Sequence, residues 1–261
     1  MDDHISRERE FWDAAYRRRR MDVTARDPRM LGLLYELEPC LYGWDYFFQL
    51  MGDPAGKRVL SVGGGIDGTA LWMAGLGADV SCLDLAEDAM TTTRALAEQT
   101  GLTQRVHCHV GRCEDMTFQA DFDIVVARKS LHHMHLPEAL LTIRAALTGS
   151  GVLLAHEPVC LSELLSRVHR RVPFHPDYPV IDGERELSRQ DLATLEAVFP
   201  RVDVHYFDLL TRPSLSYVAS RLGLKKALRT LGRVDYHVIK TIPWLRYLSS
   251  SVVIRAANSG A

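Results

Sequence analysis

The sequence predicts an α/β fold: a doubly wound, mostly parallel seven-stranded sheet with helices on both faces and an antiparallel last strand. Two observations predict it. Between residues 58 and 156, strand-like and helix-like segments alternate, as parallel strands joined by crossover helices do. Further on, two strand-like segments at 201–210 and 249–256 are joined by a long connection, which fits an antiparallel hairpin at one edge of the sheet.

The N-terminal region is predicted to be helical. In "SREREFWDAAYRRRR" (6–20), Phe11, Trp12, Ala15 and Tyr16 form one apolar stripe at helical spacing. The basic run Arg17–Arg20 suits the negative end of that helix. A second helical region, 29–51, is interrupted by Pro39 and ends before the turn-forming "DPAG".

The alternating region supplies five strands and three helices. We expect the helices at 69–77, at 87–101 and from about Pro137 to "LTGSG". The five expected strands are 58–62, 79–84, 105–110, 122–127 and 151–156.

The pattern changes after the fifth strand. Residues 159–186 read as an irregular, proline-spaced connection. Ser188 and Asp191 form a capping-box pattern, which predicts that a helix starts at Arg189 and ends before Pro200. The connection between the last two strands is expected to be helical and basic.

Composition and charge limit the protein class. With 47% hydrophobic and 25% charged residues, the chain has the composition of a soluble globular protein. The five cysteines are odd in number and contain no CxxC pair, which indicates reduced thiols. The charged N-terminus does not resemble a signal peptide, and no apolar run approaches the roughly 18 residues of a membrane span. We therefore expect a cytoplasmic protein.

The net charge of −2 hides an asymmetry. Residues 161–261 contain 15 Lys and Arg against 10 Asp and Glu, a net +5, and the remaining residues contain 16 against 23, a net −7. A basic C-terminal third can meet nucleic acid, an anionic membrane surface or an acidic substrate, or it can simply be solvated helix faces.

The loop "SVGGGIDG" (61–68) contains Gly63-x-Gly65-x-x-Gly68. Glycines at this spacing let the backbone approach a nucleotide closely, and an acid about 20 residues later binds the ribose hydroxyls. Asp84 lies at that distance. The pattern by itself fits flavin, nicotinamide and S-adenosylmethionine sites alike.

Features outside the loop separate these alternatives. The loop follows some 50 residues of helical sequence, whereas flavoproteins of this type begin with it. Residues 121–158 have no counterpart in a dinucleotide fingerprint, and the chain closes with the predicted hairpin.

At these residues the sequence resembles the class I S-adenosylmethionine-dependent methyltransferases, in particular the bacterial small-molecule group. The motifs are "VLSVGGGIDG", "GADVSCLDLAEDAM", "VHCHVGRCEDMTF", "FDIVVARKSLHHM" and "ALTGSGVLLAHEP". The resemblance is strong over 56–160 and loose over 183–256. It implies a helical lid at 1–55 and a methyltransferase domain at 56–261, with substrate-pocket insertions at about 159–186 and 211–248.

The resemblance also implies a cofactor site. Its expected residues are Gly63, Gly64, Gly65, Asp84, Leu85, Cys113, Glu114, Arg128, and Trp12 and Tyr16 of an aromatic lid. Core packing is the alternative for the two aromatics. Three positions depart from the family pattern: Ser61 replaces an acid, Asp67 a loop glycine, and Arg112 an adenine-contacting Asp.

Three side chains are candidates for proton transfer. His132 and His133 directly follow the fourth strand, and Glu157 follows the fifth. Either histidine can act as a general base with Glu157 orienting it, or these groups can serve packing and solvation. Arg128 could instead bind a carboxylate or phosphate of the acceptor, or pair with a neighbouring acid. "HHMH" (132–135) lacks carboxylate and cysteine partners at ligand spacing, so we expect no metal site.

The predicted function is transfer of a methyl group from S-adenosylmethionine to an oxygen or nitrogen of a small metabolite, in secondary metabolism, with S-adenosylhomocysteine as product. One alternative is an inactive partner subunit with the same fold. Another is an RNA methyltransferase that uses Arg17–Arg20. The stretch "ARKS" after the fourth strand disfavours the RNA alternative, because it lacks the N/D-PP-Y/F tetrad of enzymes that methylate bases.

Overall fold

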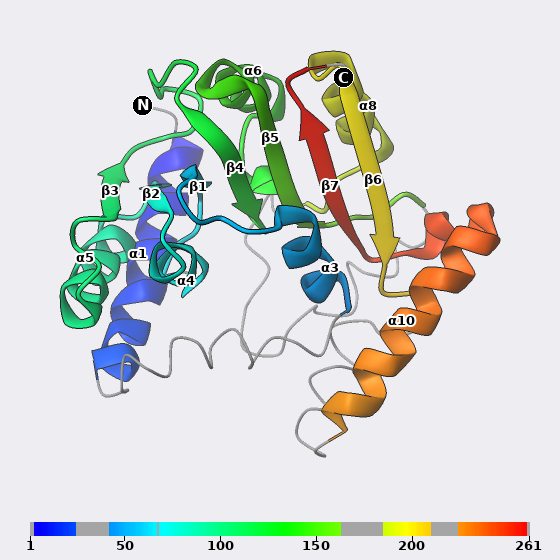
Figure 1. The fold of residues 1–261 in the computed structure, drawn as a ribbon, viewed down its shortest axis with the longest axis horizontal. Helices are drawn as coiled ribbons and strands as arrows, with labels where there is room; N and C mark the ends of the chain where they lie inside the picture. Colours follow the sequence, from blue (N-terminus) through cyan, green and yellow to red (C-terminus); the bar gives the residue numbers. More distant parts are fainter. Residues whose placement is uncertain (1–2, 25–41, 67, 163–184, 210–223, 260–261) are drawn as a thin grey trace.

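The protein forms one seven-stranded sheet with helices around it (Figure 1). The computed structural model describes residues 3–24, 42–66, 68–162, 185–209 and 224–259. The strand order is β3-β2-β1-β4-β5-β7-β6, and β7 runs antiparallel to both of its neighbours. The predicted fold class is therefore confirmed. The strands are β1 (Arg58–Val62), β2 (Asp79–Asp84), β3 (Val106–Val110), β4 (Phe122–Arg128), β5 (Leu147–Pro158), β6 (Arg201–Phe207) and β7 (Ser251–Ala257).

The helices follow the predicted order. In Figure 1, α1 and α5 lie at the β3 end of the sheet and α10 lies beyond the β6 end. The helices are α1 (Asp3–Thr24), α3 (Tyr42–Met51), α4 (Gly68–Gly75), α5 (Glu87–Thr100), α6 (Leu136–Ala146), α8 (Arg189–Val198) and α10 (Lys225–Thr241), with 3-10 turns η2 (Leu131–His133) and η3 (Pro243–Leu248).

Both faces of the sheet are buried. The successive residues Val59 and Leu60 are fully buried on opposite sides, because side chains alternate along a strand. Leu60 belongs to the core beneath α6 and α8. Val59 belongs to the core beneath α3, α4 and α5. Burial on both faces explains why these strands are continuous apolar runs in the sequence.

The N-terminal region has two different environments. Helix α1 packs on α5, where Arg17 forms an ion pair of 2.9 Å with Asp88 and the Asp13 carboxylate accepts the Asp88 N–H. Helix α3 instead packs into the sheet core with Phe47 fully buried. Only α1 is therefore placed as a lid would be, and the domain division at residue 55 stays a proposal.

The fifth strand differs from the prediction at its start. It begins at Leu147, which pairs with Phe122, and the register then shifts before Ile124 pairs with Val152. The predicted "LTGSG" turn is therefore an irregular stretch inside a longer strand. Gly151 is required there, since a Cβ would lie 2.8 Å from the Phe122 carbonyl oxygen.

Much of the two predicted pocket insertions lies outside the described residues, at 163–184 and 210–223. Pro39, Asp67 and the side chains of Tyr16 and Arg18–Arg20 also lie outside them. In the described part of the chain, no helix is both long and apolar enough to cross a bilayer.

Candidate active site

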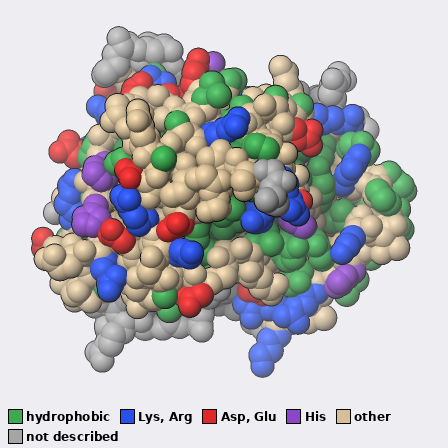
Figure 2. Space-filling view, turned by 45° about the horizontal axis from the view of Figure 1, so that its top comes forward, with side chains coloured by type: hydrophobic (Ala, Val, Ile, Leu, Met, Phe, Trp, Pro, Cys, Tyr) green, Lys and Arg blue, Asp and Glu red, His purple; other side chains and the backbone are tan. Residues whose placement is uncertain are grey.

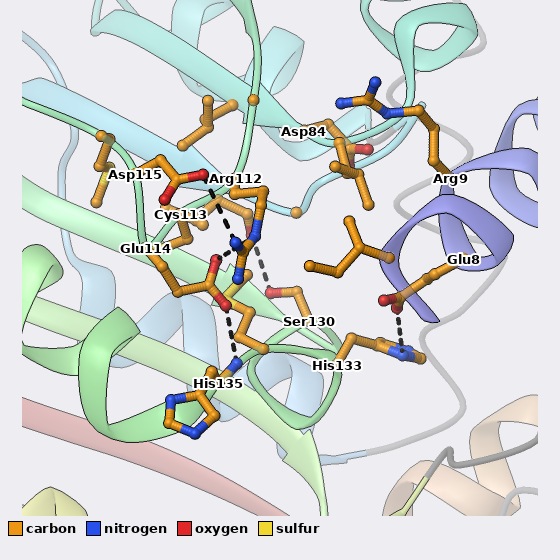
Figure 3. A pocket seen from close by; sticks show the side chains of 18 of the residues that line it. Glu8, Arg9, Asp84, Arg112, Cys113, Glu114, Asp115, Ser130, His133 and His135 are labelled. Carbon is orange, nitrogen blue, oxygen red and sulfur yellow. Dashed lines mark hydrogen bonds and ion pairs between the residues drawn. The ribbon is translucent and has the colours of Figure 1, made fainter. Parts of the chain in front are cut away.

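A cavity of about 1110 Å³ opens at the carboxyl ends of the parallel strands (Figure 3). Ligands bind at this edge in open α/β sheets, because the loops there diverge from a topological switch point. The cavity wall combines α1, the loops after β1 to β4, Glu138 of α6 and Arg185. Its residues include Glu8, Arg9 and Trp12 of α1, Val62 and Gly63 after β1, Asp84 and Leu85 after β2, Arg112–Glu114 after β3, and Lys129, Ser130, His132 and His133 after β4.

The glycine loop brings two neighbouring loops together. Gly63 and Gly65 have positive φ angles of 63° and 55°, a conformation that favours glycine. A Cβ on Gly63 would lie 2.5 Å from the Ser130 Cβ, and the Ser130 hydroxyl donates to the Val62 carbonyl. Gly63 is therefore needed for contact with the loop after β4 as well as for any approach of a ligand.

Asp84 is buried at the end of β2. Its two carboxylate oxygens accept the N–H groups of Gly65 and Ala86, each at 2.8 Å, which fixes the side chain in the cavity wall. Burial raises the pKa of Asp84, against the opposing effect of these two hydrogen bonds, and the nearby acids Asp13 and Glu8 of α1 raise it further. Each oxygen keeps a second lone pair for a hydroxyl donor.

In the loop after β3, one arginine lies beside two acidic side chains. Arg112 lies within 3.6 Å of Glu114 and 3.7 Å of Asp115, and Glu114 also accepts the His135 N–H at 2.8 Å (Figure 3). The positive charge of Arg112, which stands where the family pattern has an Asp, is thus paired with acids of the same loop. Cys113 is buried beside them, and burial raises the pKa of its thiol to about 12, so the thiol stays protonated.

Glu157 contacts His132. One carboxylate oxygen of Glu157 lies 2.6 Å from His132 Nδ1, and the other accepts the backbone N–H groups of Ser130 and Leu131 at 2.9 and 3.0 Å. Glu157 is only 1% exposed, so it is not the solvated loop acid that was the alternative. The arrangement holds the imidazole rigidly at the cavity wall.

His133 has a different partner. Its Nδ1 lies 3.1 Å from the Glu8 carboxylate, and its ring packs edge-on against Trp12 at 5.7 Å between centroids. Both partners come from α1. His133 therefore joins α1 to the loop after β4, and in the described contacts Glu157 is not its orienting acid.

Arg128 does not line the cavity. Its guanidinium lies 3.9 Å from the centre of the Trp44 ring, and it donates to the Thr69 hydroxyl at 3.3 Å. In this position Arg128 joins α3 to α4. Gly64, Gly65 and Glu157 are also not among the residues that line the cavity.

Two α1 residues were missed by the sequence reasoning. Glu8 lies one helical turn before Trp12 and so shares its face, which is a signal that helical spacing could have provided. Arg9 lines the cavity near Asp84 in Figure 3, and its buried Nε has no hydrogen-bond partner among the described residues.

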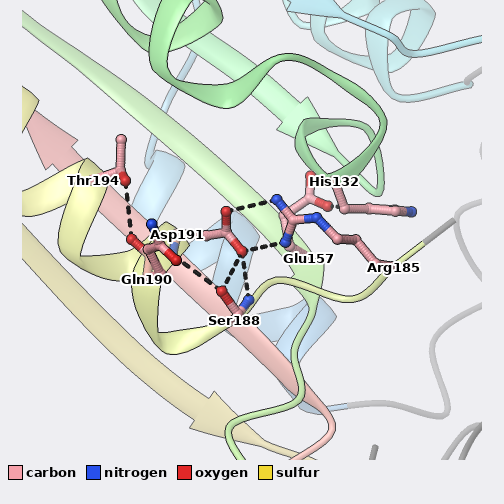
Figure 4. A network of polar contacts seen from close by, with 7 residues as sticks. All are labelled: His132, Glu157, Arg185, Ser188, Gln190, Asp191 and Thr194. Atoms are coloured by element: carbon pink, nitrogen blue, oxygen red, sulfur yellow. Dashed lines mark hydrogen bonds and ion pairs between the residues drawn. The ribbon is translucent and has the colours of Figure 1, made fainter. Parts of the chain in front are cut away.

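The start of α8 also reaches the cavity. Arg185 lines it and donates two hydrogen bonds to Asp191, which in turn accepts the N–H of Ser188 (Figure 4). The capping box predicted from Ser188 and Asp191 is present. Among the described residues, no three His, Cys, Asp or Glu side chains form a group that could hold a metal ion.

Comparison with known proteins agrees with this geometry. Residues 59–151 match the family described as "Methyltransferase domain". These residues, about a third of the chain, are thus similar to methyltransferase domains. The match spans the glycine loop, Asp84 and the loops after β3 and β4, which are the segments that form most of the cavity.

Relatives among curated proteins are named ubiquinone biosynthesis O-methyltransferases. The protein of Azoarcus sp. strain BH72 is 32% identical over 119 residues, which is 45% of this chain and 49% of the relative. That of Xanthomonas axonopodis pv. citri is 34% identical over 101 residues, 38% of this chain and 41% of the relative. This chain thus matches about half the length or less of these relatives.

Solved structures show the same fold at low identity. Geranyl diphosphate C-methyltransferase from Streptomyces coelicolor, solved with S-adenosyl-L-homocysteine, has a TM-score of 0.58 at 15% identity and covers 82% of this chain and 74% of its own. The [4+2]-cyclase SpnF has a TM-score of 0.55 at 16% identity, over 84% and 82% of the two chains. The fold is therefore shared by proteins named for different reactions.

Proposed function

We propose that this chain is an active enzyme that transfers a methyl group from S-adenosylmethionine to an oxygen or nitrogen of a small molecule. One observation carries the proposal: a single cavity joins the buried carboxylate of Asp84 to the rigid His132–Glu157 pair. The first group suits the ribose of a nucleoside, and the second suits removal of a proton from an acceptor.

The cavity chemistry fits the cofactor. Asp84 can accept both ribose hydroxyls, and the loop containing Cys113 and Glu114 can frame the adenine. The unpartnered Arg9 Nε offers a donor for the cofactor carboxylate. Bound in this way, S-adenosylmethionine would supply an electrophilic methyl group on a sulfonium centre, and carboxylates such as Glu8 and Asp84 are favourable neighbours for that cation.

His132 is the better candidate for the general base. With Glu157 ionised, Nδ1 of His132 carries the proton donated to the carboxylate, so Nε2 is the basic nitrogen. Nε2 would take the acceptor's proton as the new oxygen–methyl or nitrogen–methyl bond forms. Holding the acceptor atom close to the methyl group within the cavity would provide the other part of the rate.

An oxygen acceptor is favoured because the curated relatives are named O-methyltransferases. Secondary metabolism remains the proposed setting. The relatives' own setting, ubiquinone biosynthesis, is not carried over, since the matched residues cover less than half of this chain.

The test is ligand binding followed by turnover. Isothermal calorimetry should detect binding of S-adenosylmethionine and S-adenosylhomocysteine, and no binding of NAD(H) or FAD. Asp84→Ala should weaken S-adenosylhomocysteine binding at least about tenfold, because each charge-assisted hydrogen bond contributes roughly 1.5–3 kcal/mol. Asp79→Ala, at the exposed opposite end of the same strand, is the matched control and should bind normally.

The affinity should also depend on pH. Only ionised Asp84 accepts both hydroxyls, and burial raises its pKa above the ordinary value, so affinity should begin to fall at a higher pH than an exposed aspartate would allow. Unchanged binding by Asp84→Ala would contradict the cofactor assignment. Normal binding without methyl transfer to any of a broad panel of phenols and amines would favour the inactive-subunit alternative.

A further inference from the structure

Helix α10 and the following turn η3 form a basic element. Residues 225–248 contain six Lys and Arg and one acid, Asp235, which is buried. The inward face of α10 packs through Leu228 and Ile239, and Arg229 pairs with Asp45 of α3 at 3.0 Å. The helix is thus firmly attached, and several side chains on its other sides are exposed.

An apolar row runs along the outward face of α10. Its members recur every three or four residues and therefore lie on one side of the helix: Ala227, Leu231, Val234, Val238 and Ile242. Val234 is 50% exposed and Ile242 is 40% exposed, and Trp244 in η3 continues the row with 62% exposure. Single exposed apolar side chains are ordinary, but a continuous row ending in tryptophan indicates a binding surface.

A basic row flanks the apolar one. Lys226 and Lys240 lie two heptads apart, so they share a second side of the helix, and both are exposed. Arg233 lies between them and is also exposed, but its guanidinium is 5.6 Å from the centre of the Tyr42 ring of α3. At the right-hand edge of Figure 2, where Figure 1 has η3 and the end of α10, hydrophobic side chains lie beside Lys and Arg. The helix therefore has an exposed apolar row and, on another side, two exposed lysines.

We propose that α10 and η3 bind the surface of an anionic lipid bilayer. An exposed apolar row with Lys and Arg beside it and a tryptophan at its end is the arrangement of helices that lie in the membrane interface. The charges complement acidic headgroups, and the long Lys side chains can reach them while the Val and Ile side chains enter the acyl boundary. A protein interface is disfavoured because lysine is depleted there, and nucleic acid leaves the apolar row unburied.

The position of α10 suits this role. The helix lies beyond the carboxyl end of β6, and β4 ends toward the same side of the molecule (Figure 1). Bilayer contact through α10 would turn that side toward the lipid. This proposal is independent of the methyltransfer proposal, because it concerns a surface outside the cavity.

Vesicle co-sedimentation of the full chain tests the proposal. The protein should sediment with vesicles of phosphatidylcholine mixed with phosphatidylglycerol, and much less with phosphatidylcholine alone or at high salt. The double variant Val234→Ser/Val238→Ser should lose at least about tenfold in vesicle affinity. Lys226→Glu/Lys240→Glu should lose binding to the acidic vesicles. The control Leu141→Ser removes an equally exposed apolar side chain from α6, 58% exposed, and should bind normally.

Folding of each variant is checked by circular dichroism, and the two double variants alter different side chains, so failure of one to fold leaves the other as the test. Absence of binding to acidic vesicles would overturn the proposal, as would equal loss in Leu141→Ser. A dimer in light scattering that the Val234→Ser/Val238→Ser variant dissociates would assign the surface to a second copy and overturn it too.

Discussion

The two adjacent histidines at the cavity have different chemical partners. His132 is held by the buried Glu157 and His133 by Glu8 of α1. A histidine fixed by a buried carboxylate has a defined tautomer and suits a general base. A histidine paired with a residue of α1 instead couples that helix to the site.

The difference predicts separable effects on catalysis. His132→Asn should lower kcat by roughly 10²-fold or more with little change in S-adenosylhomocysteine affinity, because a general base acts only in the transition state. His133→Asn should mainly weaken cofactor binding, because it releases α1. Steady-state kinetics and calorimetry measure the two effects, with melting temperatures as the folding control. A His132→Asn enzyme with full kcat would reduce this residue to packing.

At the scale of elements, the capping box at the start of α8 depends on the negative charge of Asp191. Asp191 accepts hydrogen bonds from Arg185 and from Ser188 at the helix start. Burial alone would raise the pKa of Asp191, but these hydrogen bonds outweigh it and lower the pKa below its ordinary value. Ionised Asp191 therefore stabilises the folded state.

This coupling predicts a pH-dependent loss of stability in Asp191→Asn. A lowered folded pKa contributes stability above the unfolded pKa of about 3.9, and that contribution disappears as the pH falls through the folded pKa. The variant should lose about 0.5–2 kcal/mol at pH 7, as caps typically do. In urea titrations, the difference in unfolding free energy between the variant and wild type should become smaller below about pH 4. Thr194→Ala on the same helix is the control. If that difference does not change with pH, the charge of Asp191 does not stabilise the folded state.

At the scale of the whole molecule, α1 covers one side of the cavity. Its described polar contacts include those to Asp88 of α5 and His133 of η2. The Arg17–Asp88 pair is largely exposed on the Arg17 side, so it contributes only about 0–1 kcal/mol. A ligand in the cavity would add contacts to Glu8, Arg9 and Trp12.

We therefore expect the cofactor to order α1. Hydrogen–deuterium exchange of residues 3–24 should slow when S-adenosylhomocysteine is added, because bound ligand favours the docked helix. Amides of α10, whose residues are not among those that line the cavity, serve as the internal control. Glu8→Gln should speed exchange of α1 in the absence of ligand. If saturating ligand leaves α1 exchange unchanged, α1 is not a lid.

The sequence by itself determined the layers, the strand direction and the similarity to methyltransferase domains. Apolar runs such as "RVLSV" and "FDIVVA" reflect burial on both faces of the sheet, and the glycine loop and Asp84 predicted the edge at which the cavity lies. Ser188 and Asp191 predicted the start of α8 for the same reason: a cap depends on residues three apart.

Only the tertiary structure decided the pairing of side chains from distant segments. Glu157 and Glu8 lie 25 and 125 residues from the histidines they contact, and Arg128 turns away to Trp44 because α3 packs beside it. Gly63 is needed because its loop packs against Ser130 in another loop, which is also a contact between distant segments. Such contacts depend on how the crossovers bring strand ends together, and no periodicity in the chain encodes them.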